Sequence, residues 1–406
     1  MKKYVHILVI TVVLLLAASF CVSAAAGGIY VNDGSSVLTA GAGNVWVLGG
    51  SGAFPQSISG AYVLSAEGLT TLSGLPSSSG AGTGATGGNV GGGGGLRHTD
   101  GRVALPASRL LVGLRYYYSS SRDSSVDSAL LENIGGGGFV LGYLDSARRF
   151  VSYGEGFTIA AARIVLRPAG NGCIDVCDEA GQLLWSSPST DRETYLAVHP
   201  LPHNGTSLCR YSGSRYTGDF AFADLGNRRL TVVNAVDMES YVIGVCAGEM
   251  GTSFPLEALK AQAVAARTYA MFNVQSRTYY NACGFDLTAD TYSQVYLGYF
   301  EDAALTAAAQ QTENQYLTYD GRLIDALFFS ADGGETLDSE LVFSSALPYL
   351  RGYPDPYEGS AWTQGALGHR VGMSQWGAYA MAKYYSFNYG EILGFYYTGV
   401  GLSYGY

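Results

Sequence analysis

Residues 241–270 read Tyr-Val-Ile-Gly-Val-Cys-Ala-Gly-Glu-Met-Gly-Thr-Ser-Phe-Pro-Leu-Glu-Ala-Leu-Lys-Ala-Gln-Ala-Val-Ala-Ala-Arg-Thr-Tyr-Ala, and they decide the fold of this part of the chain. The apolar run at 241–245 predicts a buried strand. A turn is expected at 247–248, with the carboxylate of Glu249 in it. A helix is predicted after Pro255, because proline is tolerated in the first turn of a helix.

Apolar residues recur at helical spacing after this proline and predict one buried helix face. Its members are Leu256, Leu259, Ala263, Ala266 and Ala270. Lys260 and Arg267 lie one heptad apart on an adjoining face. The segment is therefore expected to carry two cations near a lone acid.

This segment resembles the core of the SpoIID/LytB family of bacterial cell-wall proteins. The family pattern is roughly Tyr-Leu-x-Gly-Val-x-x-x-Glu-Met, then Trp-Pro-x-Glu-Ala-Leu-Lys-Ala-Gln-Ala-Val-Ala-Ala-Arg-Thr-Tyr, and the match is nearly unbroken. The resemblance implies a lytic transglycosylase acting on peptidoglycan, or a close non-catalytic relative. Together with the strand patterns below, it predicts an α+β fold in which a β-rich N-terminal part precedes a mixed helix/strand core.

Composition limits the partners of the protein. The chain has 406 residues, of which 48% are hydrophobic, and a formal net charge of -10. Its length predicts two or three folding units. An acidic chain without basic clusters argues against nucleic-acid binding and against holding an anionic cell wall by bulk charge. Any grip on wall glycan is therefore expected from local polar groups and aromatic faces.

The first 26 residues are predicted to be a signal peptide or a membrane anchor. Two lysines precede an apolar run, and Val22-Ser-Ala24 fits a cleavage site. Residues 4–26 carry no Asp, Glu, Lys or Arg and are long enough to span a bilayer uncleaved. A lipoprotein is less favoured, because Phe20 is a poor neighbour for Cys21. All these interpretations predict an exported protein, extracellular or cell-wall associated.

Three further regions are expected along the chain. Residues 27–108 form a Gly/Ser-rich low-complexity region with short strand-like pieces, and 77–95 predict a flexible tether. Residues 109–406 are expected to form the SpoIID/LytB-like domain, with its core motifs in 230–406. Strands are predicted at 110–118, 139–143, 161–166, 174–176, 183–185, 207–216 and 230–236. A hairpin turn is predicted at 178–182, between two of these strands.

Neither cysteines nor histidines suggest a metal site. Five cysteines remain after Cys21, an odd number without tight spacing, so free thiols or a single bridge are expected. Relatives of the resembled family can hold zinc with Cys and His in the segment that corresponds to 285–296. This chain has Thr288, Tyr292 and Ser293 there, and neutral hydroxyls are poor zinc ligands. No zinc, other metal or cofactor is therefore expected.

Two later motifs also resemble the family. Ser-Ala-Asp-Gly-Gly-Glu-Thr at 330–336 is similar to Ser-x-x-Gly-Gly-x-Thr, and Gly-His-Arg-Val-Gly-Met-Ser-Gln-Trp-Gly-Ala at 368–378 is similar to Gly-His-Gly-Val-Gly-Met-Ser-Gln-x-Gly-Ala. Helices are predicted at 303–315 and 379–385, with a hairpin turn at Asp320-Gly321. The chain departs from the pattern at Arg370, which replaces a glycine, and in 338–367, which is shortened.

The lone acid suits one kind of glycosidic cleavage. Ordinary glycoside hydrolases use two carboxylates. In a lytic transglycosylase the N-acetylmuramic acid supplies its own C6 hydroxyl as nucleophile, so one glutamate first donates and then accepts a proton. Glu249 is therefore the predicted general acid and base, and burial beside Cys246 and Met250 predicts a raised pKa.

The other candidate residues are substrate contacts. Lys260 and Arg267 are expected to orient substrate carboxylate or N-acetyl oxygens or to hold the Glu249 loop, although a solvated helix face explains them equally well. Further expected contacts are Gln294, Tyr296, Ser330 and His369.

These residues are compatible with two functions. The first is a lytic transglycosylase that cleaves MurNAc-GlcNAc bonds of glycan strands to 1,6-anhydro ends during sporulation. The second is a non-catalytic glycan-binding protein that enhances an N-acetylmuramoyl-L-alanine amidase; Arg370 and the shortened segment favour it. A purely structural surface protein is a weaker third reading. The expected partners are peptidoglycan glycan strands and, in the second reading, a cell-wall amidase.

Overall fold

The computed structural model describes most of the chain after residue 95. The described residues are 21–25, 28–32, 37–41, 44–46, 62–65, 68–71, 96–154, 157–202, 207–226 and 228–406. Residues 1–20 of the expected leader and the expected tether at 77–95 lie outside them. No helix in the described ranges combines the length and the apolar character that a membrane span requires.

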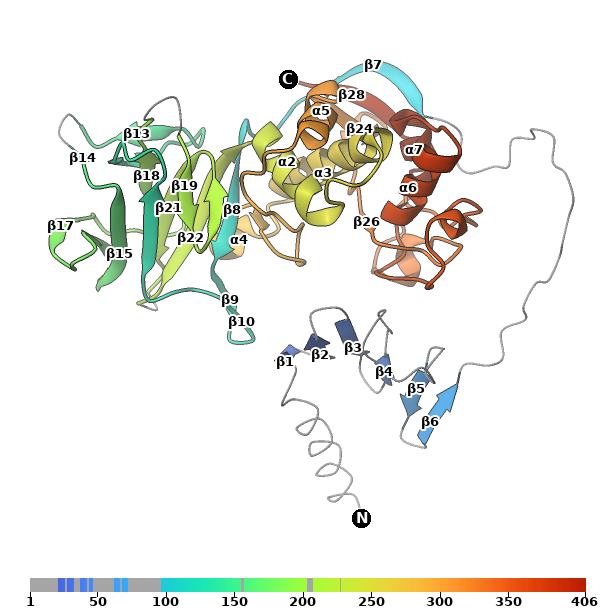
Figure 1. Cartoon of the computed structure of the whole chain (residues 1–406), viewed down its shortest axis with the longest axis horizontal. Helices are drawn as coiled ribbons and strands as arrows, with labels where there is room; N and C mark the ends of the chain where they lie inside the picture. The colour runs from blue at the N-terminus through green and yellow to red at the C-terminus, as the bar shows by residue number, and fades with distance from the viewer. Residues whose placement is uncertain are drawn as a thin grey trace, which may run out of the picture. The chain divides into compact units, whose positions relative to one another are not determined.

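The chain divides into two compact units, the first made of Met1–Asn89 with Ser119–Arg122 and the second of Val90–Tyr118 with Asp123–Tyr406. The described part of the first unit contains an antiparallel meander (Figure 1). Its strands are β1 (Cys21–Ala25), β2 (Gly28–Asn32), β3 (Val37–Gly41), β4 (Asn44–Trp46), β5 (Tyr62–Ser65) and β6 (Gly68–Thr71). Of the strand-like pieces expected in this region, 29–31 lies within β2, and 45–46 of the piece at 45–48 lie within β4, whereas 47–48 lie outside the described residues.

The second unit contains two facing β-sheets, which are drawn mostly in green in Figure 1. One has the order β17-β16-β15-β11-β19-β20, and the other has the order β13-β12-β18-β21-β22-β8-β23, with β14 beside β12. Ile164 and Val176 from the first sheet share one core with Val198 and Phe222 from the second. The faces are buried together because alternate residues of each strand point to the same side.

The strands of these sheets have the following bounds: β8 (Arg109–Arg115), β11 (Ala129–Asn133), β12 (Phe139–Leu144), β13 (Phe150–Ser152), β14 (Thr158–Ile159), β15 (Arg163–Gly170), β16 (Cys173–Cys177), β17 (Leu183–Ser186), β18 (Leu196–Pro200), β19 (Cys209–Tyr211), β20 (Ser214–Tyr216), β21 (Asp219–Asp224), β22 (Leu230–Asp237) and β23 (Leu287–Thr288). A small two-stranded ribbon joins β9 (Tyr117–Ser119) and β10 (Arg122–Asp123). Strands β11, β18 and β21 were not predicted. The hairpin turn at 178–182 is confirmed by the pairing of β16 with β17.

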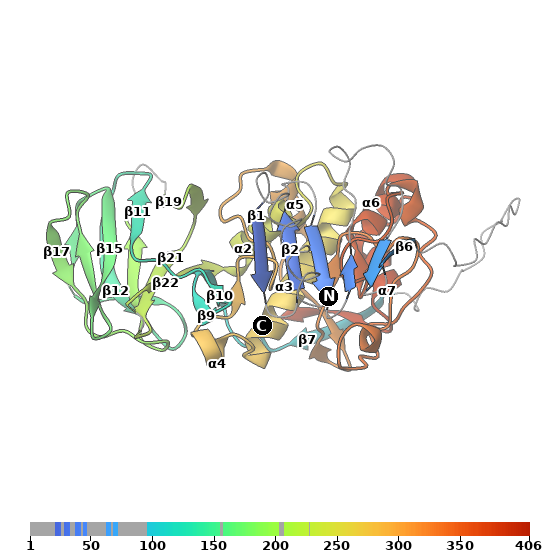
Figure 2. The same ribbon diagram turned by 90° about the horizontal axis from the view of Figure 1, so that it is seen from below.

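Helix α3 (Leu256–Ser276) is the centre of the remaining structure. It packs against α2 (Met238–Glu249), α5 (Ala303–Gln311), α6 (Gln375–Tyr384) and α7 (Tyr389–Tyr396), and Figure 2 shows these helices from a second side. A four-stranded sheet of β25 (Arg322–Leu323), β24 (Gln315–Tyr319), β28 (Gly401–Gly405) and β7 (Arg97–Val103) meets α3 through β24 and β25. The short elements are α4 (Tyr280–Cys283), β26 (Phe328–Phe329), β27 (Met373–Ser374) and the 3-10 turns Ser339–Leu341 and Glu358–Ser360.

The mixed α+β fold is confirmed, and so is the helix after Pro255. Pro255 occupies the N-cap position of α3. The buried alanines of α3 have small side chains, so neighbouring elements can pack closely against this helix. Leu256 is exposed, whereas the other members of the expected apolar face are fully buried. The hairpin at Asp320-Gly321 is also confirmed, with both residues at positive φ between β24 and β25.

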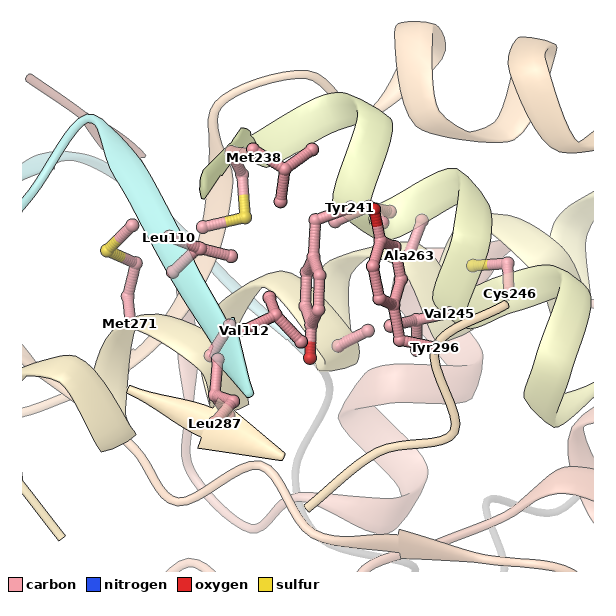
Figure 3. Packing of buried hydrophobic residues seen from close by; sticks show 14 of the residues in the cluster. Leu110, Val112, Met238, Tyr241, Val245, Cys246, Ala263, Met271, Leu287 and Tyr296 are labelled. Atoms are coloured by element: carbon pink, nitrogen blue, oxygen red, sulfur yellow. The ribbon is translucent and has the colours of Figure 1, made fainter. Parts of the chain in front are cut away.

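The strand expected at 241–245 is wrong, because these residues lie in α2. Strand β22 ends at Asp237, whose side chain caps the helix by accepting a hydrogen bond from the Ser240 backbone N–H. A short apolar run does not distinguish a buried strand from a buried helix. Figure 3 shows the buried face of α2, with Tyr241 close to the ring of Tyr296. Glu249 is consequently the last residue of a helix and not part of a strand-to-helix turn.

Candidate active site

Glu249 lies half-buried at the C-terminal end of α2. Its Oε1 accepts a hydrogen bond of 2.8 Å from the backbone N–H of Val295, and its Oε2 accepts one of 3.2 Å from Nε2 of Gln375. Burial raises the pKa of Glu249 above its ordinary value, although these two hydrogen bonds act in the opposite direction. The geometry therefore favours a carboxyl group that holds its proton to higher pH than an exposed glutamate.

Gln294 and Tyr296 position the backbone group that binds Glu249. Nε2 of Gln294 donates to the hydroxyl of Tyr241 at 3.1 Å, and the Tyr296 hydroxyl donates to Asn234 at 2.9 Å. Both side chains are buried, which contradicts their expected role as direct substrate contacts. They lie on either side of Val295, so their burial holds the Val295 N–H against α2.

Gly248 allows this segment to lie directly on the helix. A Cβ atom at Gly248 would come within 2.4 Å of the Val295 carbonyl oxygen. Real Cβ atoms do not approach an oxygen so closely, so any larger residue must push the segment or the helix away. The glycine before Glu249 is therefore part of the geometry that brings the Val295 N–H to the carboxylate.

Gln375 belongs to the motif at 368–378 but is not among the site residues that the sequence predicts. It is the first residue of α6, and Ser374 caps that helix by accepting a hydrogen bond of 3.0 Å from the Gly377 N–H. The amide side chain is buried and reaches Glu249 across 126 positions of sequence. Its place in the Gly-Met-Ser-Gln motif was the available signal, but only the fold connects it with Glu249.

Arg267 is a structural residue and not a substrate contact. Its side chain is 0% exposed and binds Glu239 through two hydrogen bonds, of 3.0 and 2.6 Å. It also donates to the backbone carbonyls of Ala263, Ala309 and Gln315. Burial thus overturns the expected substrate contact, and the guanidinium instead holds the first turn of α2 against α3.

Lys260 also has internal partners. Its Nζ lies 2.6 Å from Oε1 of Glu257 and 4.8 Å from the ring centroid of Tyr389. Oε2 of Glu257 accepts a hydrogen bond from the Tyr389 backbone N–H, so the pair connects α3 with α7. With only 12% of its side chain exposed, Lys260 is placed for this contact and poorly placed to orient a sugar.

His369 is enclosed by two aromatic rings. The ring centroids of Phe329 and Phe343 lie 5.3 and 5.4 Å from that of the histidine. Nδ1 accepts a hydrogen bond from the Val371 N–H, and burial lowers the pKa of His369 to about 4. The imidazole is therefore neutral near neutral pH. No hydrogen bond within the described ranges connects it to Glu249.

The motif at 330–336, which we call the Gly-Gly element, meets Arg370 near this histidine. The half-buried Ser330 accepts a hydrogen bond from the Trp376 N–H through its carbonyl oxygen. Arg370 has a positive φ of 63°, a conformation that glycine adopts more easily, and its guanidinium donates to Glu335 at 3.0 Å. This conformation gives a physical reason for the glycine of the family pattern.

Aromatic side chains gather around Trp376 at the start of α6. Trp376 follows Gln375 directly, and its ring lies 5.3 Å from Trp362, 5.2 Å from Phe254 and 5.3 Å from Tyr379 between centroids. Phe254 follows Glu249 by five positions. All four side chains are partly exposed. We call Phe254, Trp362, Trp376 and Tyr379 the aromatic face.

Two other places of interest lie apart from Glu249. At positions 288, 292 and 293, where no zinc ligand is expected, the Thr288 hydroxyl donates to Asp290 and its backbone N–H donates to the Ser293 hydroxyl, while Tyr292 is exposed. A hollow of about 810 Å³ is lined by Arg148 and Arg192, among others, and by none of the expected site residues.

Comparisons with known proteins identify the family. The family model described as stage II sporulation protein (SpoIID) matches residues 226–319, which include Glu249. An uncharacterized protein of Brachyspira hyodysenteriae is 30% identical over 272 residues, or 47% of this chain and 73% of that protein. Stage II sporulation protein D of Bacillus subtilis is 36% identical over 31% of this chain and 40% of its own length.

An amidase enhancer of Bacillus subtilis is also similar, with 42% identity over 26% of this chain and 14% of its own length. This chain therefore covers less than half of either Bacillus protein. The Brachyspira protein, in contrast, is matched over most of its length. Together with the helix-end glutamate and the motif that supplies Gln375, these matches show that the chain belongs to the SpoIID/LytB family.

Proposed function

We propose that this protein is a lytic transglycosylase that cleaves MurNAc-GlcNAc bonds of peptidoglycan glycan strands, with Glu249 as general acid and base. The observation that carries the proposal is the state of Glu249, a half-buried carboxyl group with a raised pKa and two neutral donors. The names of the Bacillus relatives support the coarser statement, a role connected with the cell wall or with sporulation.

The reaction needs only one carboxyl group. Protonated Glu249 donates its proton to the glycosidic oxygen, and the bond from that oxygen to C1 of MurNAc breaks. The C6 hydroxyl of the same sugar attacks C1 and gives its proton to the Glu249 carboxylate. The products are a 1,6-anhydro-MurNAc end and a GlcNAc with a free C4 hydroxyl, and the acid is regenerated.

The two donors are suited to the second half of this cycle. After proton donation, the Val295 N–H and the Gln375 amide bind the carboxylate oxygens that then act as the base. Within the described residues no second carboxylate makes a hydrogen bond to Glu249 or to Gln375. The proposed internal attack by the sugar needs no second carboxylate, unlike the mechanism of ordinary glycoside hydrolases.

The aromatic face supplies the expected grip on the glycan. Aromatic rings offer large apolar surfaces with polar groups at their edges, and the C–H face of a pyranose can pack on such a surface. Trp376 follows Gln375 directly in α6, and we expect a glycan bound on this face to extend to the site of Glu249. This supports neutral, aromatic recognition in a protein whose net charge is -10.

The test uses the purified full chain on peptidoglycan glycan strands, with and without stem peptides. We expect 1,6-anhydro-MurNAc ends in the mass spectrum, and a loss of at least ~100-fold in their rate of formation for Glu249→Gln. Glu313→Gln is the matched control, because Glu313 is an exposed glutamate. Normal cleavage by Glu249→Gln would exclude Glu249 as the acid.

A second candidate function is a non-catalytic glycan-binding protein that enhances an amidase. It is favoured by the similarity to the amidase enhancer and by the short segment at 338–367. Binding to glycan strands without any anhydro ends, together with faster release of stem peptides by an added N-acetylmuramoyl-L-alanine amidase, would establish it. In that case Glu249→Gln would leave the enhancement unchanged.

A further inference from the structure

Three buried carboxylates meet at a place that the proposed reaction does not use. Asp332 belongs to the Gly-Gly element, and Asp355 and Glu358 belong to the segment that leads to the last motif. Their exposed fractions are 0%, 4% and 1%. One oxygen from each carboxylate lies within 4.8 Å of the other two. We call these three residues the acid cluster.

The acid cluster has no cationic side chain. Among the described residues, none of the ion pairs of Lys, Arg or His includes Asp332, Asp355 or Glu358. Burying several carboxylates without a counter-charge is unfavourable, so they must take up protons or a cation. This contrasts with Arg267 and Glu239, a buried charge that has its partner.

Hydrogen-bond donors already hold two of the carboxylates in place. Glu358 accepts from the backbone N–H groups of Asp332 and Gly333, at 2.6 and 2.8 Å, and from the Ser374 hydroxyl. Asp355 accepts from the Tyr396 hydroxyl. Because each carboxylate oxygen has two lone pairs, these oxygens can also bind a cation.

One oxygen of Asp332 lacks a hydrogen-bond partner. Its Oδ1 accepts from the Gly334 N–H at 2.7 Å, but its Oδ2 is buried and has no hydrogen-bond partner. Leaving a buried acceptor without a partner is costly. Gly377 leaves room for the Asp355 carboxylate, since a Cβ atom at this position would lie 2.5 Å from Oδ2 of Asp355. The site is therefore a fixed set of oxygens with one buried oxygen left unpartnered.

Donor chemistry and spacing select the class of ion. Ligands that are all carboxylate oxygens suit hard cations such as Mg²⁺ and Ca²⁺. Ca–O distances of 2.3–2.6 Å allow two ligands to stand about 4.6–5.2 Å apart across the ion, whereas Mg–O distances allow only about 4.0–4.2 Å. Three oxygens that all lie within 4.8 Å of one another fall inside the span of a Ca²⁺ shell.

We propose that Asp332, Asp355 and Glu358 form a Ca²⁺ site, with Oδ2 of Asp332 among its ligands. The three residues supply up to six carboxylate oxygens, against the six to eight that Ca²⁺ takes. A bound ion joins the Gly-Gly element to the 355–358 segment. Through the Glu358–Ser374 contact it also holds the start of α6, where Gln375 reaches Glu249.

The test is a calorimetric titration of CaCl₂ into the chelator-treated full chain, with thermal unfolding in parallel and MgCl₂ and NaCl for comparison. We expect one Ca²⁺ per chain and a melting temperature about 2–4 °C higher with Ca²⁺. Asp332→Asn is expected to lose both effects. Asp325→Asn is the matched control, because Asp325 also has a buried, unpartnered oxygen but lies outside the acid cluster, so it should keep both effects.

Either of two results would overturn the site. One is a Ca²⁺ response that persists in Asp332→Asn, which would place the ion elsewhere. The other is a wild-type chain that binds no Ca²⁺ in the calorimeter but shows the infrared band of a protonated carboxyl group that Asp332→Asn removes. Two carboxylates so close can share one proton, and that band would show that a proton, and not a metal ion, offsets the charge of the acid cluster. The wild-type titration decides the matter even if the variant fails to fold.

Discussion

The two ends of helix α2 each carry a glutamate, in opposite surroundings. Glu239 in the first turn binds the buried guanidinium of Arg267. Glu249 at the other end accepts hydrogen bonds only from neutral donors. The partial negative charge of a helix C-terminus also disfavours an ionised Glu249. One helix therefore carries a structural anchor at its start and a proton-holding acid at its end.

The ion pair of Glu239 and Arg267 should have the largest effect on the free energy of unfolding. Glu239→Ala leaves Arg267 buried without its counter-charge, so we expect the free energy of unfolding to fall by about 3–5 kcal/mol. Urea unfolding followed by circular dichroism measures this change. The control is Glu179→Ala, which removes the exposed pair with Arg163 and should cost far less, because solvent screens an exposed ion pair. Equal losses for the two variants would contradict the assigned difference.

The packing at the acid end should matter next. Gly248→Ala places a methyl group against the Val295 carbonyl, and we expect a loss of about 1–3 kcal/mol in stability with weaker glycan cleavage. Gly390→Ala in α7 is the control, because its nearest neighbouring atom lies 3.2 Å from the added Cβ. A Gly248→Ala variant with unchanged stability and cleavage would show that the Val295 contact is dispensable.

Removing the amide donor should have a smaller effect. Gln375→Ala deletes one neutral hydrogen bond to Glu249, so we expect cleavage to slow by about tenfold, while the free energy of unfolding changes by about 1 kcal/mol. The anhydro-end assay and urea unfolding together measure both values. Gln310→Ala, at an exposed position of α5, serves as the control. Cleavage at the wild-type rate would remove Gln375 from the site.

The pH dependence of stability should carry the smallest signal. The pKa of Glu249 is raised in the folded protein, so its contribution to stability is present below the unfolded value near 4.5 and is lost as pH rises through the folded pKa. Glu249→Gln cannot ionise, so this variant should gain stability relative to wild type as pH rises through that window. Unfolding curves at several pH values test the sign. A gain that shrinks with rising pH would contradict the raised pKa.

Sequence patterns predicted much of the fold where the local signal was unambiguous. The helix after Pro255 and the Asp320-Gly321 hairpin depend on proline and glycine conformations that few alternatives satisfy. The run at 241–245 failed because apolar residues fit a buried helix as well as a buried strand. Its assignment as a helix depends on the boundary at Asp237, where strand β22 ends and where the Asp237 side chain caps α2.

The sequence alone determined the family resemblance, the mixed fold and the choice of Glu249, since these follow from residue identity and short spacing. Only the tertiary structure decided what surrounds that acid. It buried Arg267, brought Gln375 to the carboxylate and gathered three acids into one cluster. Burial and contacts between distant segments arise from packing of the whole core, and spacing along a chain does not contain that information.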